Sequence, residues 1–124
     1  MGNSKGFTLL ELMIVVVIIG ILASIAIPKF GATKQRAYIT AVKSDLRNLV
    51  TAEESYYADN VTYSNTLATS SFNTSAGVTV VISGASGTGW SATGVHSGAP
   101  SHTCSIYMGD AVIAGQSPGN PVCQ

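Results

Sequence analysis

The feature that most constrains this chain is an apolar stretch near its N-terminus, from Phe7 to Ile27. Its 21 residues are mostly Leu, Ile, Val, Met and Ala, and Glu11 is the one ionisable side chain among them. At a rise of about 1.5 Å per residue, a helix of this length crosses a hydrocarbon layer of about 30 Å. We therefore predict a membrane-spanning helix that carries a single carboxylate close to its start.

Charged residues are few and are sorted along the chain. Six basic and six acidic residues give a net charge of zero. Most of the bases lie between Lys29 and Arg47, most of the acids lie between Asp45 and Asp59, and Asp110 is the only charged residue after position 59. Because nucleic-acid binding needs clustered Lys and Arg, the neutral C-terminal half argues against a DNA- or RNA-binding function.

The middle of the chain has the periodicity of an amphipathic helix. Residues of one stripe recur at steps of three and four, at Ile39, Val42, Leu46, Leu49, Glu53 and Tyr56. Glu53 is the polar exception, and we expect it near the helix end, where water is close. Pro28 predicts a kink rather than an end, because the helical periodicity resumes beyond it. The simplest prediction is one long helix from about Phe7 to Ala58.

The C-terminal part predicts a small antiparallel sheet. Runs rich in β-branched residues alternate with Gly-rich turns, and the expected strands are Val78–Ile82, Trp90–Val95 and Thr103–Met108, with Ala111–Ala114 as a candidate fourth. The polar segment 60–76 is expected to be a loop that places Tyr63, Leu67 and Phe72 in the core. Packing the sheet against the amphipathic half of the helix buries both apolar faces, which predicts an α+β fold.

Two cysteines, Cys104 and Cys123, lie in the C-terminal part. In an oxidising compartment they would pair and hold the C-terminus on the third strand, and we prefer this reading to free thiols beside a membrane helix. A zinc site formed with His96 and His102 lacks finger-like ligand spacing. Since Ser, His and Asp110 also show no spacing that favours a catalytic triad, we expect no metal, no cofactor and no enzyme activity.

The charges beside the apolar stretch favour a membrane topology opposite to the one that the cysteine pair favours. Lys29, Lys34 and Arg36 follow it, and the positive-inside tendency alone would keep that side in the cytoplasm. The cysteine pair favours export of the same side. Charge alone therefore leaves the topology open.

The most specific motif is KGFTLLEL, residues 5–12, where a short polar leader ends in Gly and the apolar run begins at once. An ordinary secretory signal has its cleavage site after the apolar region. Ser24-Ile25-Ala26 would offer such a site after Ala26, but Glu11 within the apolar region and the Gly6–Phe7 boundary argue against it.

From Lys5 to Pro28 the chain resembles the type IV pilins and pseudopilins, whose type III signal has this arrangement. The resemblance implies that a membrane prepilin peptidase and N-methyltransferase cuts after Gly6 and methylates the new N-terminal Phe7. It also implies a pilin-like α+β fold, with a long N-terminal helix, a small antiparallel sheet and a C-terminal disulfide loop.

Three further residues stand at positions that the family uses. Glu11 matches the acidic fifth position, which implies an assembly role through pairing with the α-amine of Phe7 in its own or a neighbouring subunit. A carboxylate costs at least about 2.5 kcal/mol at the bilayer centre, so a tolerated interfacial charge is the weaker reading. Gly20 and Pro28 match the positions where the family softens its helix.

The resemblance also implies a domain organisation. Residues 1–6 would be the leader peptide, 7–28 the transmembrane and filament-core half of the helix, 29–58 its amphipathic half, and 59–124 the loop and sheet. Before assembly the chain would lie in the cytoplasmic membrane, and after assembly in an extracellular pilus on the cell surface.

The implied function is that of a structural subunit of a type IV pilus, polymerising into a filament for adhesion, motility or DNA uptake. The implied partners are other copies of the chain, the prepilin peptidase, a membrane platform protein and an assembly ATPase. One alternative is a pseudopilin of a type II secretion or competence system. The other is a monomeric membrane-anchored binding protein, in which a change at Glu11 would do no harm.

Overall fold

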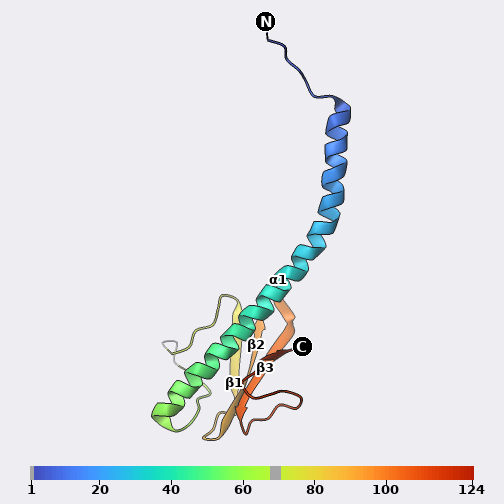
Figure 1. Ribbon diagram of the computed structural model, residues 1–124. Helices are drawn as coiled ribbons and strands as arrows, with labels where there is room; N and C mark the ends of the chain where they lie inside the picture. The colour runs from blue at the N-terminus through green and yellow to red at the C-terminus, as the bar shows by residue number, and fades with distance from the viewer. Residues whose placement is uncertain (1, 68–70) are drawn as a thin grey trace. The chain divides into compact units, whose positions relative to one another are not determined.

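The computed structural model describes residues 2–67 and 71–124. Met1 of the expected leader and residues 68–70 of the expected loop lie outside the described residues. In the described parts, the helix α1 (Leu9–Asn60) is followed by the strands β1 (Val78–Ser83), β2 (Gly89–His96), β3 (Ala99–Gly109) and β4 (Val122–Cys123) (Figure 1). The chain divides into a first unit, Met1–Lys34, and a second unit, Gln35–Gln124, and α1 contributes to both.

The first unit is a helical segment with an unburied apolar surface. Every large apolar side chain from Leu9 to Ile27 is at least 50% exposed. An 18-residue window of α1 reaches a mean hydropathy of 2.9 with none of it buried, so its length and composition suit a membrane span. The helix continues through Pro28, as predicted, and its bounds lie within two residues of the expected ones.

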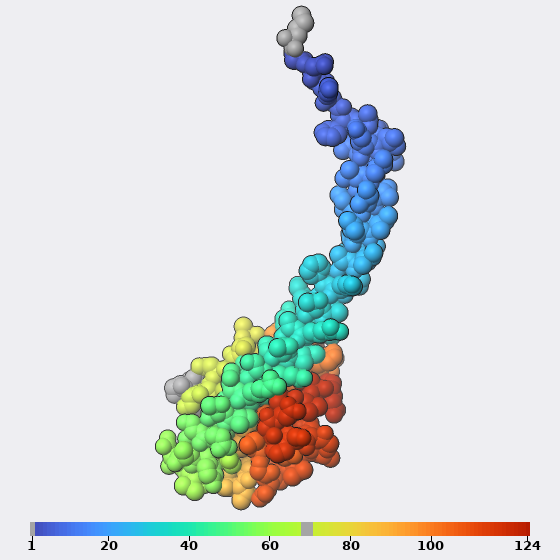
Figure 2. All heavy atoms as spheres, viewed as in Figure 1, coloured from blue at the N-terminus to red at the C-terminus, as the bar shows by residue number. Residues whose placement is uncertain are grey.

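The second unit packs the rest of α1 on an antiparallel sheet of order β1-β2-β3-β4. In Figure 2 this part of the helix, teal to green, lies at the surface of the unit. The core between helix and sheet contains Val42, Leu46, Leu49, Val78, Trp90, Ala92, Cys104 and Ile106. Gly94 of β2 lets the helix approach closely, because a Cβ there would stand 2.8 Å from Cγ1 of Val42.

The three main strands confirm the predicted ones, and the fourth does not. Alternation along β2 buries Trp90 and Ala92 and leaves Thr93 exposed. Ala111–Ala114 is not a strand and lies in a segment of turns, which makes that prediction wrong. The free edge of β3 is taken instead by β4, because the paired cysteines bring the C-terminus to it.

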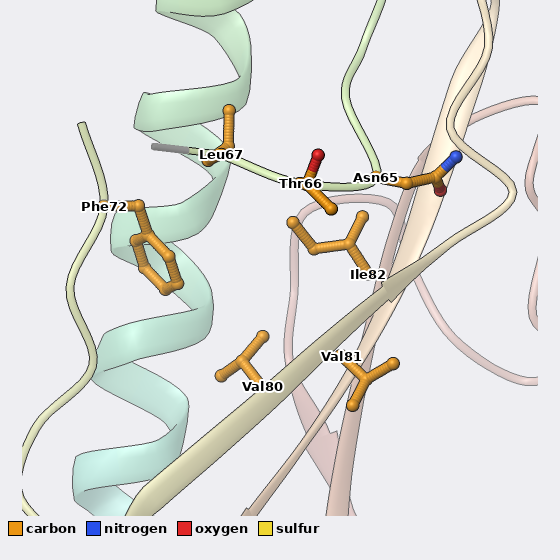
Figure 3. Close-up of a pocket in the computed structure, with 7 residues that line it drawn as sticks. All are labelled: Asn65, Thr66, Leu67, Phe72, Val80, Val81 and Ile82. Carbon is orange, nitrogen blue, oxygen red and sulfur yellow. The ribbon is translucent and has the colours of Figure 1, made fainter. Parts of the chain in front are cut away.

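The segment after α1 places its apolar residues on the core as predicted. Tyr63, Leu67 and Phe72 are partly buried against the core residues. Figure 3 shows Leu67 and Phe72 beside Val80 and Ile82 of β1, around a pocket of about 320 Å³. The loop thus packs on β1 through these two side chains.

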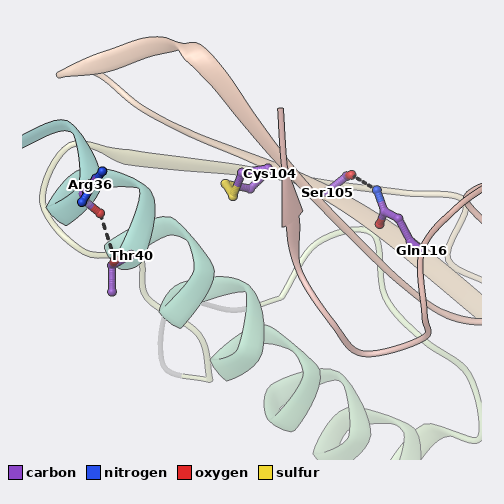
Figure 4. The surroundings of a disulfide bond; sticks show 6 residues. Arg36, Thr40, Cys104, Ser105 and Gln116 are labelled. Atoms are coloured by element: carbon purple, nitrogen blue, oxygen red, sulfur yellow. Dashed lines mark hydrogen bonds between the residues drawn. A yellow bond between two sulfur atoms is a disulfide. The ribbon is translucent and has the colours of Figure 1, made fainter. Parts of the chain in front are cut away.

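A disulfide joins Cys104 to Cys123 and confirms the expected pairing (Figure 4). The two residues face each other across β3 and β4, and the backbones of Thr103 and Gln124 exchange two hydrogen bonds of 3.0 Å beside them. The Gln116 amide donates to the Ser105 hydroxyl at 2.6 Å, which ties the intervening loop back onto β3.

Two buried carboxylates hold the loop against α1. Glu53 has no exposed surface, so the expectation that it lies near water is wrong. Its Oε2 accepts the Ser64 N–H at 3.0 Å, and its Oε1 has no partner among the described residues. Asp45, 3% exposed, accepts both the N–H and the hydroxyl of Ser75, at 2.7 and 2.9 Å. Burial raises the pKa of Glu53, the Ser64 N–H opposes this, and the charge of Glu54 adds to it.

Replacing both cysteines, Cys104→Ala with Cys123→Ala, is expected to lower the free energy of unfolding of the second unit by about 3 kcal/mol, because the bond closes a loop of 19 residues. The fluorescence of Trp90, the only tryptophan and fully buried, reports unfolding of the full chain in detergent. Reduction of the disulfide in the native chain should lower the free energy of unfolding by a similar amount. An unchanged midpoint in both experiments would contradict this prediction.

The raised pKa of Glu53 predicts a stability that depends on pH. The folded chain holds this proton more tightly than the unfolded chain, so the contribution is complete at low pH and is lost as pH rises through the raised pKa. Glu53→Gln keeps an oxygen for Ser64 and does not ionise. The melting temperature of the variant should therefore exceed that of the native chain by a margin that grows between pH 5 and pH 8. A difference in melting temperature that does not depend on pH would refute the raised pKa of Glu53.

Candidate assembly site

Thr8 and Glu11 form a reciprocal cap at the start of α1. The Thr8 N–H donates to Oε2 of Glu11 at 2.8 Å, and the Glu11 N–H donates to the Thr8 hydroxyl at 3.2 Å. The Thr8 hydroxyl donates to the same carboxylate oxygen at 2.9 Å. This is the capping box of a helix N-terminus, in which two side chains satisfy backbone donors that the helix leaves free.

The cap gives Glu11 a role inside its own chain. A carboxylate in the first turn also interacts favourably with the helix dipole. The capping-box signature Thr-x-x-Glu is present in the sequence at residues 8–11. Glu11 was interpreted only as a charge in an apolar run, so its capping role was missed. In the described residues the bonds go to Oε2, so Oε1 is left without a donor and can accept one from elsewhere.

The expected processing point lies outside the helix. Gly6 and Phe7 precede α1 in exposed backbone, and Phe7 is 85% exposed. A Cβ built at Gly6 would meet no atom within 4 Å. The Gly6–Phe7 peptide bond is therefore accessible, as cleavage by a peptidase requires, and the helix begins two residues later.

Gly20 and Pro28 both lie within α1, in the first unit. A Cβ at Gly20 would meet nothing within 4 Å, so packing within the chain gives no reason for a glycine there. Pro28 has no N–H to donate to the carbonyl four residues earlier. Both residues weaken the helix locally, as the expected softening of the helix at these two positions requires.

The side chains considered for metal binding have other contacts. His96 stacks on Tyr38 with ring centroids 4.0 Å apart, and its Nδ1 accepts the Gly98 N–H at 2.8 Å. Both cysteines are in the disulfide. In the chain outside Met1 and residues 68–70, no three His, Cys, Asp or Glu side chains gather as a metal site would require.

Comparison with known proteins identifies the family. The prokaryotic N-terminal methylation motif matches residues 1–27. The type IV wide pilus major component of Thermus thermophilus is 43% identical over 102 residues, covering 79% of this chain and 78% of that protein. The chain belongs to the type IV pilin family. A match of that extent must continue past the end of α1 into the sheet-bearing part.

Other members of the pilin family match a shorter part of the chain. The type IV major pilin protein of Myxococcus xanthus is 48% identical over 63 residues, which is 51% of this chain but only 29% of that protein. The type II secretion system core protein G of Pseudomonas aeruginosa is 41% identical over 64 residues, covering 52% of this chain and 45% of its own length.

The capping box predicts that Thr8→Val loosens the first turn of α1. Loss of an N-cap costs about 1 kcal/mol, so exchange of the Glu11 amide, which donates to the Thr8 hydroxyl, should accelerate about fivefold in the full chain in detergent micelles. Thr8→Ser keeps the hydroxyl and is the matched control, with exchange close to native. Equal exchange in Thr8→Val and the native chain would show that the cap does not form.

Proposed function

We propose that this chain is the structural subunit of a type IV pilus. The observation that carries the proposal is the match to a pilus major component over both the helix and the sheet-bearing part. The exposed apolar surface of Leu9–Ile27 supports it, because such a surface needs either lipid or other copies of itself. Transfer between these two apolar surroundings needs no hydrophobic gain, so packing and polar contacts decide assembly.

The proposed path begins in the cytoplasmic membrane. A prepilin peptidase and N-methyltransferase removes residues up to Gly6 and methylates Phe7, which creates a cationic α-amine. The free Oε1 of Glu11 accepts this amine from a neighbouring subunit and sets the register of each addition. Gly20 and Pro28 let the helix adjust when it packs against other copies in the filament.

The proposed partners follow from this path. Copies of the chain form the filament, and a membrane platform protein and an assembly ATPase drive it to the cell surface. There the pilus would serve adhesion, motility or DNA uptake. The matches to a major pilin and to a pilus major component support a structural rather than an enzymatic role for this subunit.

The second candidate is a pseudopilin of a type II secretion or competence system. The match to the secretion system core protein G favours it, because that protein is 41% identical to this chain over 64 residues, about half of the chain. The pilus reading is preferred because the pilus component of Thermus thermophilus matches a larger part of the chain.

Mass spectrometry of the N-terminal peptide, from material sheared off the cell surface, tests the proposal. A peptide that begins at N-methylated Phe7 in long surface fibres is the expected result. The same peptide confined to the membrane fraction would favour the pseudopilin. A chain that begins at Ile27 would mean ordinary signal cleavage and would end the filament proposal.

Glu11→Gln separates the charge of this residue from its capping role, because Gln also serves in a capping box. We expect normal processing at Gly6, near-native amide exchange in the first turn and at least tenfold fewer surface fibres. Quantitative immunoblots of sheared and membrane fractions measure the loss. Native fibre yield from this variant would contradict the proposed assembly role of the Glu11 charge.

A further inference from the structure

The bases that follow the apolar stretch lie on the side of the membrane that charge disfavours. The segment 12–44 contains four Lys or Arg residues and no Asp or Glu. A disulfide persists in oxidising compartments, so the bond between Cys104 and Cys123 favours export of the side on which these bases lie. The positive-inside tendency would retain the same bases in the cytoplasm. Because the bases work against export, their presence calls for a role on the exported side.

Two of these bases belong to the first unit and have no internal partner. Lys29 and Lys34 are exposed, and neither ammonium group forms a hydrogen bond or an ion pair with a described residue. The residues three and four positions before and after each lysine, which are its neighbours on a helix, are uncharged. Glu11, the acid of this unit, lies at the opposite end of the apolar stretch. Both lysines are therefore available to an external anion.

An exposed aromatic ring lies between the two lysines. Phe30 is 68% exposed, and it shares a side of the helix with Lys34, four residues later. The helical rise places Lys29 about 3 Å and Lys34 about 10.5 Å beyond Ile27. The headgroup layer of a bilayer extends about 5–7 Å beyond the hydrocarbon, and the flexible stem of a lysine lets both ammonium groups reach it. We call Lys29, Phe30 and Lys34 the interfacial cluster.

We propose that the interfacial cluster binds the headgroups of anionic phospholipids, with both ammonium groups on phosphate oxygens and the Phe30 ring at the edge of the acyl chains. The inference rests on the proposed function in one respect, namely that the chain lies in a bilayer before assembly. Other copies in the same membrane bring the same lysines to this level, so lipid phosphates are the anions available there. Release of the subunit into a fibre would have to break these contacts.

The range of the attraction limits which bases take part. The attraction of Lys or Arg to an anionic membrane surface decays within a Debye length, about 8 Å at physiological salt. Lys29 and Lys34 lie within or close to this range of the headgroup layer. Arg47 is separated from Ile27 by about 30 Å of helix, so its charge contributes little.

Reconstitution of the full chain into phosphatidylcholine vesicles tests the proposal. Trace amounts of spin-labelled phosphatidylglycerol or spin-labelled phosphatidylcholine report, by electron paramagnetic resonance, the fraction of each lipid held at the protein surface. We expect the native chain to prefer phosphatidylglycerol at least threefold, and we expect high salt to lower this preference because it screens the charges. Inorganic phosphate should lower it no more than chloride of equal ionic strength, since the bound phosphate belongs to a lipid.

Substitution of the two lysines identifies the groups that cause the preference. Lys29→Gln/Lys34→Gln should at least halve it, whereas Lys29→Arg/Lys34→Arg keeps both charges and should retain it. The control Lys43→Gln/Arg47→Gln removes the same charge from the second unit and should behave as the native chain does. All variants keep Lys5, so any contribution of the leader to lipid binding is the same in each.

A second measurement locates Phe30 in the membrane and does not depend on charge. Phe30→Trp adds an exposed indole to the buried one of Trp90. Lipids with a spin label near the glycerol should quench the added emission more strongly than lipids labelled at the end of the acyl chain. The native chain, in which Trp90 is the only tryptophan, supplies the background. Stronger quenching from the chain end would overturn the placement of the interfacial cluster at the headgroups.

The outcomes separate this inference from the proposed function. Equal binding of the two lipids by the native chain, or a full preference in Lys29→Gln/Lys34→Gln, would overturn the inference and leave the pilus proposal intact. A full preference in this variant together with a loss of surface fibres would overturn it in favour of a second copy as the partner of these lysines. Absence of surface fibres from the native chain would defeat the proposed function and leave the lipid preference standing.

Discussion

The apolar surface of Leu9–Ile27 is the constraint on which the rest of this structure depends. None of the residues that the structure describes buries it, and nearly all of its side chains are apolar, so it needs lipid or other apolar helices. In either environment the backbone must satisfy its own hydrogen bonds, which makes an α-helix the natural solution. At the start of that helix the first N–H groups have no partner within the helix. The reciprocal cap of Thr8 and Glu11 satisfies two of the free N–H groups there.

No described residue of the first unit is buried, so the second unit has to be stable by itself. It achieves this with a core centred on Trp90, Leu46 and Ile106, and with a disulfide that fastens a two-residue final strand. Asp45 and Glu53 lie in the same interface and hold the loop by its backbone. The nearly neutral sheet leaves the charges of α1 as the main electrostatic feature of the unit.

Local patterns in the sequence predicted most of this fold. The stripe Val42, Leu46 and Leu49, the alternation along β2 and the motif at Gly6–Phe7 are local signals, and the helix, strands and family followed from them. Polar contacts and strand pairings between distant residues were the part that escaped prediction. Periodicity placed Glu53 on the buried face but could not show that the Ser64 N–H would stabilise it there. Ala111–Ala114 had strand composition, yet β4 took the edge of β3 because of the bond to Cys104. The cap at Thr8 could have been predicted from the Thr-x-x-Glu spacing, but Glu11 was interpreted only through its charge.

The central claim is that residues 7–27 leave the membrane and become the inside of a fibre. A reconstruction of surface fibres by electron cryomicroscopy, at a resolution that shows side chains, tests it most directly. The account predicts that these segments from neighbouring copies pack together along the fibre axis, with the carboxylate of Glu11 beside the α-amine of Phe7 in an adjacent copy and the sheets outside. Fibres built from sheet contacts alone, with the apolar segment missing or detached from its neighbours, would contradict the account.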